Sequence, residues 1–151
     1  MKAGLILLDI KEKDEVMIPE FICDSVLQPF NELKIRPIFF KVHDNLNPNW
    51  KDVNKKYTTK TKAIMMTHFF GFPNEINLFK KFKKDKNILL IEDYCHGYNG
   101  KFYGKKIGSF GDISFSSLKK NFTYIKFRRN TKNKYKIKKI SIRIFTKFKK
   151  S

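Results

Sequence analysis

Cysteine, glycine and long apolar runs are all scarce in this sequence of 151 residues, and each shortage excludes a class of protein. The two cysteines, Cys23 and Cys95, lie far apart and form no CxxC pair, which favours reduced thiols in a cytoplasmic protein over a disulfide framework. No apolar stretch reaches the roughly 20 residues that a membrane-spanning helix needs. The seven glycines form neither GxGxxG nor GxxxxGKS/T, so neither a dinucleotide site nor a P-loop is indicated.

Acidic residues are missing from the last fifth of the chain. Residues 119–151 hold 14 of the 33 Lys and Arg residues and no Asp, Glu, Gly or Pro, so most of the net charge of +19 lies there. Phe and Tyr are interleaved with these positive charges. Such a tail is typical of proteins that hold nucleic-acid phosphates and stack on bases, so nucleic-acid binding is one hypothesis for this chain.

The rest of the chain alternates short apolar runs with amphipathic stretches. Strands are predicted at 16–18, 36–42, 63–67, 87–91 and 112–116, and helices at 3–10, 24–33, 47–57 and 74–84. Pro19 should end the first strand. Candidate helix caps are Asp24, Asn47 or Asn49, and Asn74. Strands that alternate with helices indicate βαβ units, so the predicted fold class is α/β, with a mostly parallel sheet and flanking helices.

The pattern changes after Gly97. The stretch NGKFYGKK contains two glycines and a Tyr-Gly pair, which favours a tight turn or a hairpin. Gly108 and Gly111 flank Ser109 and Phe110, which indicates a special turn or a close approach of the backbone to another group.

Asp93 is the first candidate for a chemical role. It follows the apolar run ILLIE at the carboxyl end of a predicted parallel strand, where open α/β sheets bind ligands. A carboxylate there can pair with the protonated ring nitrogen of a pyridine cofactor, which keeps the ring an effective electron sink. From its position alone, an aspartate that caps a helix or shapes a turn is the other interpretation.

Lys120 and Ser117 follow the last predicted strand. A lysine whose pKa is lowered by its surroundings can act as an amine nucleophile and form a Schiff base. The hydroxyl of Ser117, three residues earlier, could bind a phosphate oxygen. Composition does not separate Lys120 from Lys119, or either of them from an ordinary solvated lysine.

Histidine appears at two of the predicted strand ends. His96 could join Asp93 and Cys95 in a metal cluster, but no second group at ligand spacing accompanies them, and we predict no metal site. For His68, a histidine held by structural hydrogen bonds is the favoured interpretation. No GxSxG motif supports a Ser-His-Asp triad.

Four segments carry a resemblance to a known family. They read DEVMIP at 14–19, TKAIMMTHFFGFP at 61–73, IEDYCHG at 91–97 and GSFGDISFSSLKK at 108–120. In this order they resemble the DegT/DnrJ/EryC1/StrS family of sugar aminotransferases, which are fold-type-I enzymes dependent on pyridoxal 5′-phosphate. The resemblance covers roughly residues 5–120 and implies part of the large, cofactor-binding domain of such an enzyme.

The resemblance implies a role for each candidate residue. Asp93 matches the aspartate that pairs with the pyridine nitrogen, and His96 takes the place of a glutamine or histidine beside the cofactor ring. Ser117 matches the serine near the phosphate, and Lys120 matches the Schiff-base lysine. Such an enzyme is a homodimer that transfers an amino group from a donor such as glutamate to a ketosugar, usually nucleotide-linked, commonly in the synthesis of polysaccharides or antibiotic sugars.

Family members are much longer than this chain, so we expect a truncated member. It would comprise a partial large domain at residues 1–120 and a basic tail at 121–151. It would lack the upstream phosphate-binding loop, the glycine pair after the lysine and the C-terminal small domain. Truncation should impair catalysis, which makes a non-catalytic remnant a third hypothesis, and uncovered apolar faces should lower solubility.

The composition of the tail leads to a prediction about the gene. Its Lys, Asn, Ile and Phe content is what A- and T-rich DNA yields in an unselected frame, so we expect a truncation or frameshift near Lys120, with a disordered tail as the alternative. Sequencing the gene should reveal another downstream frame that restores the glycine pair and a small domain. Their absence from every frame would contradict the hypothesis.

Overall fold

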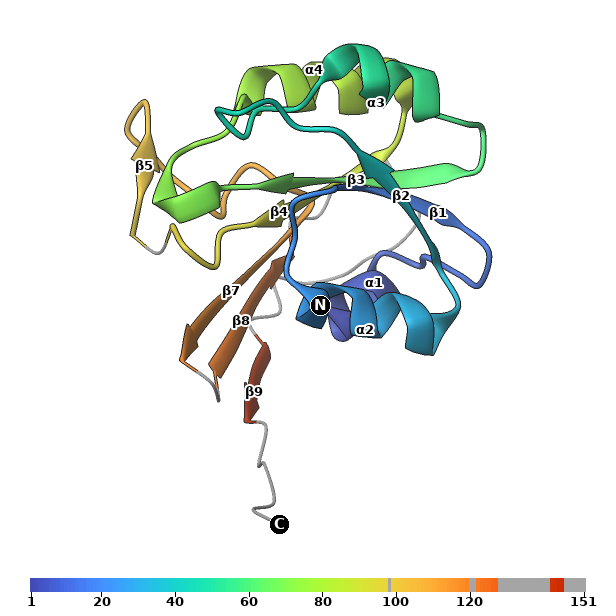
Figure 1. Cartoon of the computed structure of the whole chain (residues 1–151). Helices are drawn as coiled ribbons and strands as arrows, with labels where there is room; N and C mark the ends of the chain where they lie inside the picture. The colour runs from blue at the N-terminus through green and yellow to red at the C-terminus, as the bar shows by residue number, and fades with distance from the viewer. Residues whose placement is uncertain (98, 120–121, 128–141, 146–151) are drawn as a thin grey trace.

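A seven-stranded sheet forms the centre of the structure, a computed structural model that describes residues 1–97, 99–119, 122–127 and 142–145 (Figure 1). In spatial order the strands are β2 (Arg36–Phe40), β1 (Glu15–Pro19), β3 (Thr61–Thr67), β4 (Leu89–Asp93), β7 (Ile113–Lys119), β8 (Phe122–Phe127) and β9 (Ile142–Phe145). The first five pair in parallel, and the last two pair antiparallel. The predicted α/β fold with a mostly parallel sheet is therefore confirmed.

Helices cover both faces of this sheet and bury its side chains in two separate cores. Helices α1 (Lys2–Leu7) and α2 (Asp24–Leu33) lie on one face, and α3 (Trp50–Lys56) and α4 (Ile76–Lys86) lie on the other (Figure 1). Successive residues of a strand point to opposite faces. The core under α1 and α2 includes Leu5, Val16, Ile18, Phe30, Ala63, Met65, Ile91, Ile113 and Phe115. The core under α3 and α4 includes Met17, Phe40, Val53, Ile64, Met66, Ile76, Phe79, Phe82 and Leu90.

The order of the strands reverses between β1 and β3. The chain leaves β1 through α2 to reach β2 at the edge, and then returns through α3 to β3 on the other side of β1. In open α/β sheets the carboxyl ends of the strands on either side of such a reversal diverge and leave a crevice for ligands. Asp93 ends β4, which is the neighbour of β3, so the candidate residue lies close to this crevice.

The ends of some strands and helices differ from the predicted ones, because hydrogen bonds of the backbone decide where these elements begin and end. Pro19 was expected to stop the first strand, but it is the last residue of β1. The strand can include a proline there because the pairing of β1 with β3 stops at Met17, so no hydrogen bond needs an N–H from Pro19. Asp24 is the first residue of α2, and Cys23 occupies the cap position. Asn49 caps α3, since its side chain accepts a hydrogen bond from the backbone N–H of Asp52 at 3.1 Å.

Asn74 joins loops instead of capping α4, which begins at Ile76. Its amide nitrogen donates to the backbone oxygens of Thr67 at 3.1 Å and Leu46 at 3.4 Å, and its amide oxygen accepts from the N–H of Glu75 at 2.7 Å. The side chain is therefore used in the tertiary structure and is not available for the first turn of the helix.

The predicted hairpin after Gly97 is confirmed. Strands β5 (Lys101–Phe102) and β6 (Lys105–Lys106) pair antiparallel around Tyr103 and Gly104, whose φ angles are 45° and 74°. A two-residue turn with both φ angles positive fits the twist of a hairpin. The hairpin projects from the body of the molecule at the left of Figure 1, so the connection from β4 to β7 contains a hairpin where the other crossovers contain a helix.

Two strands of the sheet, β8 and β9, come from the segment beyond Lys120, and their backbone pairing extends the sheet past β7. In the part of the chain that the structure describes, no helix is both long and apolar enough to cross a membrane.

Phe79 provides a test of the core under α3 and α4. It is 1% exposed, and its ring lies 5.1 Å from that of Trp50. Phe79→Ala should lower the free energy of unfolding in urea by about 3–5 kcal/mol, because it leaves a cavity in a packed core. The matched control is Phe72→Ala, at a side chain that is 76% exposed, which should cost less than about 0.5 kcal/mol. Similar losses in the two variants would contradict this placement of the core.

Candidate functional site

Asp93 lies at the carboxyl end of β4, between Thr67 of β3 and Phe115 of β7 in the register of the sheet. It is 7% exposed, and its Oδ1 accepts a hydrogen bond from the backbone N–H of Cys95 at 3.0 Å. Burial raises the pKa of the Asp93 carboxyl, although hydrogen bonds from Cys95 and the charge of His96 act in the opposite direction. The structure thus holds a carboxylate that lacks enough positive charge around it to offset its loss of water.

His96 follows Asp93 on the loop that leaves β4 and is exposed to solvent. Its Nδ1 accepts a hydrogen bond from the backbone N–H of Phe70 at 3.4 Å, and the two rings stack with centroids 6.0 Å apart. Because Nδ1 accepts, the proton of the neutral ring is assigned to Nε2. His96 can therefore donate a hydrogen bond from Nε2 to a ligand at the carboxyl edge.

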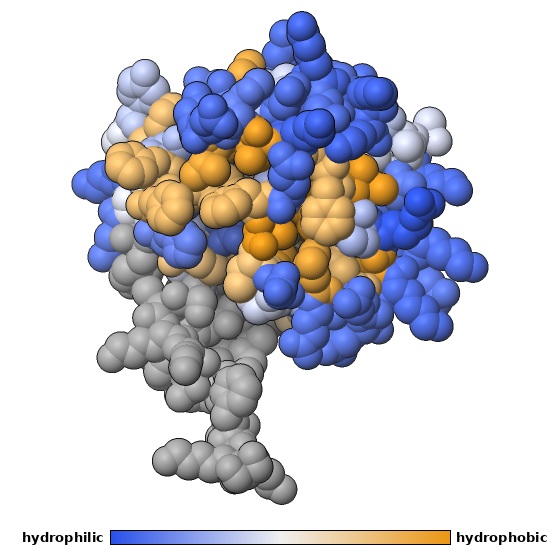
Figure 2. All heavy atoms as spheres, in the orientation of Figure 1, coloured by the Kyte–Doolittle hydropathy of each residue, from blue (hydrophilic) through white to orange (hydrophobic). Residues whose placement is uncertain are grey.

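Aromatic side chains surround this edge. Phe21 follows β1 and lies with its ring 5.6 Å from that of Phe69, which follows β3, so the two rings meet across the reversal of strand order. Phe21, Phe70 and Phe72 are 52%, 66% and 76% exposed. Figure 2 shows apolar side chains gathered in a band across the visible face, between hydrophilic surfaces above and below. An exposed apolar surface of this kind favours binding of a flat ligand or of another protein surface.

The remaining two candidates are Ser117 and Lys120. Ser117 belongs to β7, where its backbone pairs with Thr123 of β8, and its side chain is not described. Lys120 lies outside the described residues. The structure therefore places Asp93 at the end of β4 and His96 on the loop that follows it, and the roles expected of Ser117 and Lys120 stay predictions.

Glu92 was not a candidate in the sequence, yet it accepts more hydrogen bonds than any other carboxylate in the described part of the chain. Its Oε1 accepts from the N–H of Gly108 at 2.7 Å and lies 3.1 Å from Nε2 of His68. Its Oε2 accepts from the N–H groups of Phe110 and Gly111, both at 2.7 Å, and from Oγ of Ser114 at 3.1 Å. The carboxylate is fully buried and ties the loop before β7 to β4.

These hydrogen bonds decide the ionisation of Glu92. Burial alone would raise the pKa of its carboxyl, but the hydrogen bonds from His68, Gly111 and Gly108 outweigh burial and lower the pKa. His68 is itself buried, and its Nδ1 accepts from the N–H of Asn74 at 3.1 Å. The proton of the neutral ring therefore lies on Nε2 and points to Glu92. The predicted structural role of His68 is confirmed.

The loop around Glu92 needs its two glycines. A Cβ at Gly111 would lie 2.5 Å from the backbone oxygen of Ile113 and 2.7 Å from Cβ of Glu92. Gly108 has a φ of 83°, and a Cβ there would lie 2.7 Å from the ring of Tyr94. The predicted close approach of backbone is confirmed.

Asp112 fixes the other end of the same loop. Its Oδ2 accepts from the N–H of Leu90 at 2.8 Å, its own N–H donates to the oxygen of Leu90 at 2.8 Å, and it forms an ion pair with Lys83 of α4. Together, Asp112 and Glu92 hold this loop against β4.

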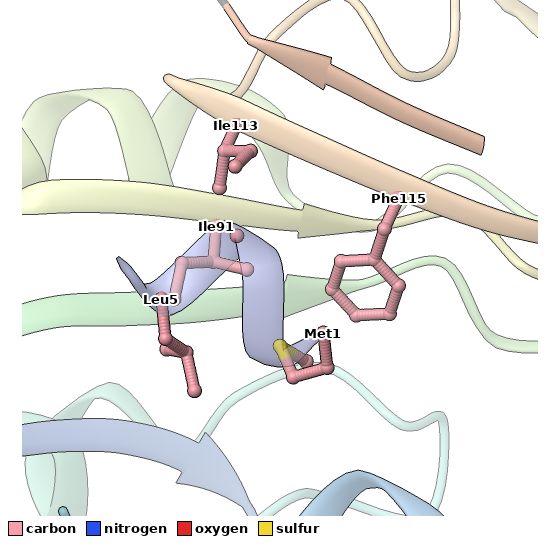
Figure 3. A pocket seen from close by; sticks show the side chains of 6 residues that line it. Met1, Leu5, Ile91, Ile113 and Phe115 are labelled. Carbon is pink, nitrogen blue, oxygen red and sulfur yellow. The ribbon is translucent and has the colours of Figure 1, made fainter. Parts of the chain in front are cut away.

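An apolar pocket lies between α1 and the two strands that carry the site. Figure 3 shows Met1, which precedes α1, and Leu5 of α1 near Ile91 of β4 and Ile113 and Phe115 of β7, and Gly4 completes the lining. No lining side chain carries a charge or a hydroxyl, so the pocket offers little to a phosphate or a sugar. We interpret it as a gap in packing below the carboxyl edge.

No group of three or more His, Cys, Asp or Glu side chains among the described residues is arranged to hold a metal ion. Sequence reasoning missed Glu92, which looks like one more buried position in the run ILLIE. The one clue in the sequence was the pair Gly108 and Gly111. These glycines predicted a tight loop, and the backbone N–H groups of that loop donate to Glu92.

Comparison with known proteins identifies the class of fold first. The large domain of fold-type-I aminotransferases has this architecture. The putative sugar aminotransferase Spr1654 from Streptococcus pneumoniae, in its PLP form, superimposes with a TM-score of 0.75 over 86% of this chain and 39% of its own, at 20% identity. The structure thus corresponds to part of such a domain.

The family follows from sequence. The model of the DegT/DnrJ/EryC1/StrS aminotransferase family matches residues 1–126, and the chain belongs to this family. GDP-perosamine synthase from Escherichia coli O157:H7 is 35% identical over 124 residues, which are 80% of this chain and 33% of that protein. A dTDP-4-dehydro-2,3,6-trideoxy-D-glucose 4-aminotransferase from Saccharopolyspora spinosa is 31% identical over 75% of this chain and 30% of its own. The chain spans about a third of the length of these relatives.

The family match passes residue 120 by six residues, into β8. The boundary predicted at Lys120 and the frame of the tail stay predictions.

Glu92→Gln tests the buried hydrogen bonds. Gln presents an NH₂ group where Glu92 accepts only from donors, so the variant should lose about 3 kcal/mol of unfolding free energy at neutral pH. Because the pKa of folded Glu92 is lowered, its contribution is complete above the ordinary value of 4.5 and is lost as pH falls through the folded value. Urea unfolding from pH 7 to pH 3 should show the two proteins converging in acid.

The control is Glu12→Gln at an exposed position, which should change stability by less than about 0.5 kcal/mol. A Glu92→Gln protein as stable as the wild type at pH 7 would show that these hydrogen bonds do not support the fold.

Proposed function

We propose that this chain forms the cofactor-binding part of a sugar aminotransferase and binds pyridoxal 5′-phosphate at the carboxyl edge of β3, β4 and β7. The observation that carries the proposal is the buried, desolvated carboxyl of Asp93 at the end of β4. Membership of the aminotransferase family and the likeness to sugar aminotransferases support it.

The residues at this edge suit the pyridine ring. Burial disfavours the ionised form of Asp93, and a protonated ring nitrogen would supply the missing positive charge. His96 can donate from Nε2 at the same edge, and the exposed ring of Phe70 stacks on it and limits its movement. When bound, pyridoxal phosphate supplies an electron-withdrawing ring that stabilises negative charge on a neighbouring carbon.

The chain's own residues divide the work. Asp93 holds the proton on the ring nitrogen, and His96 orients the ring edge. Glu92 and His68 fix the loops on the opposite face of the sheet, so that β4 and its carboxyl end keep their positions. By family resemblance, we assign the phosphate to Ser117, and proton transfer and attachment of the cofactor to Lys120.

The substrates are proposed on the same basis. An amino-acid donor such as glutamate and a nucleotide-linked ketosugar agree with the names of the relatives, which are a GDP-perosamine synthase and a dTDP-sugar aminotransferase. We also propose a homodimer and a cytoplasmic setting. The alternative, nucleic-acid binding through residues 119–151, gains no support from the family or from the relatives.

Binding of pyridoxamine 5′-phosphate to the full chain tests the proposal. This amine form avoids the reaction of the aldehyde with the many surface lysines, so that titration calorimetry or ring fluorescence reports the site itself. Asp93→Asn should weaken binding at least about tenfold, because a neutral amide cannot pair with a protonated ring nitrogen. Asp44→Asn, at an exposed position, should leave binding unchanged.

Stability gives a second measurement on the same variants. Because the pKa of folded Asp93 is raised, its ionised form costs free energy at neutral pH, and the cost disappears as pH falls from the folded value towards the ordinary 3.8. Without ligand, Asp93→Asn should therefore be more stable than the wild type at pH 7, and the difference should shrink in acid. A wild-type chain that does not bind the cofactor amine would contradict the proposed function.

A further inference from the structure

Two buried hydroxyl groups have no hydrogen-bond partner among the described residues: Oγ1 of Thr67 and Oγ of Ser116. Thr67 is 7% exposed, and Ser116 is fully buried. A buried hydroxyl without a partner costs free energy, and such groups are rare in folded proteins. Each hydroxyl therefore either forms its hydrogen bond with a bound ligand or lowers the stability of the fold.

The two hydroxyls lie on opposite faces of the sheet. On β3, Ala63 and Met65 belong to the core under α1 and α2, whereas Ile64 and Met66 belong to the other core. By this alternation, Thr67 points to the face of α1 and α2. On β7, Ile113 and Phe115 belong to that same face, so Ser116 points to the opposite face, the one on which Ser114 binds Glu92.

Thr67 shares its face with Asp93. The two residues are direct partners in the parallel register of β3 and β4, and partners in register point to the same face. The amino group of Met1, at the start of α1, interacts with the charge of Asp93, which agrees with this face. Thr67 is also the last residue of β3, the strand beside the reversal of strand order.

We propose that Thr67 is a further binding residue, whose hydroxyl hydrogen-bonds the oxygen substituent of the bound pyridine ring, on the ring whose nitrogen Asp93 holds. The inference rests on the proposed function. The hydroxyl can donate and accept at once, so it suits this ring oxygen whether or not the oxygen carries a proton. Without a ligand, the unpaired hydroxyl lowers the free energy of unfolding, and a bound ligand that hydrogen-bonds it removes this loss.

The backbone of Thr67 explains why the side chain stays in place. Its carbonyl oxygen accepts from Nδ2 of Asn74 at 3.1 Å, and its neighbour His68 is fixed between Glu92 and Asn74. These bonds hold the end of β3 from the opposite face. The hydroxyl is therefore presented by a rigid strand end, which favours a defined contact over an adaptable one.

The experiment compares three variants of the full chain, with pyridoxamine 5′-phosphate as the probe. Thr67→Val keeps the shape and removes the hydroxyl, Thr67→Ser keeps the hydroxyl, and Ser116→Ala removes the unpartnered hydroxyl of the other face. Thr67→Val should weaken binding about three- to tenfold, the usual effect of one lost hydrogen bond, whereas Thr67→Ser and Ser116→Ala should bind like the wild type.

Thermal unfolding without the ligand separates binding from folding. Thr67→Val and Ser116→Ala should both melt at or above the wild-type temperature, because each removes an unsatisfied buried hydroxyl. The added stability that the probe confers should be reduced in Thr67→Val only.

The outcomes separate the two proposals. Unchanged binding by Thr67→Val, or equal weakening by Ser116→Ala, would overturn the role of Thr67 while binding by the wild type and its loss in Asp93→Asn uphold the proposed function. Failure of the wild type itself to bind would overturn both.

Discussion

The buried carboxylate of Glu92 is the interaction on which the rest of the site depends. It accepts hydrogen bonds from the loop before β7, from β7 itself and from His68 at the end of β3. One side chain thus ties together three neighbouring strands, at the carboxyl ends of β3 and β4 and at the start of β7. A buried charge of this kind is tolerated only when its hydrogen bonds are complete, and the short glycine-containing loop completes them.

Two adjacent acids of one strand behave in opposite ways because they face opposite sides of the sheet. Glu92 is surrounded by donors, which lower the pKa of its carboxyl. Asp93 is buried with fewer donors, and its pKa is raised. The first acid stabilises the structure, whereas the second remains short of positive charge. A ligand with a cationic ring would pair with Asp93 and leave the hydrogen bonds of Glu92 unchanged.

Sequence patterns predicted the α/β sheet, the hairpin and the position of Asp93, because each depends on local alternation or on glycine. The uses of Asn74 and Pro19 could not be predicted, since both depend on which neighbouring strand or loop supplies a partner. Glu92 and Thr67 were missed for the same reason. A strand residue shows its face only after the register is known, and Thr67 becomes notable only as the partner of Asp93.

The place of β4 within the sheet has a consequence for motion. It is the fourth of seven strands, with β3 on one side and β7 on the other, so its amide groups are bonded or shielded on both sides. Amides in such a central strand exchange with solvent only when the whole domain opens, whereas those of exposed connections exchange through small local openings. Asp93 thus ends a strand that is shielded on both sides, whereas Phe70 and His96 lie on the connections that follow β3 and β4 and are held there by their contact with each other.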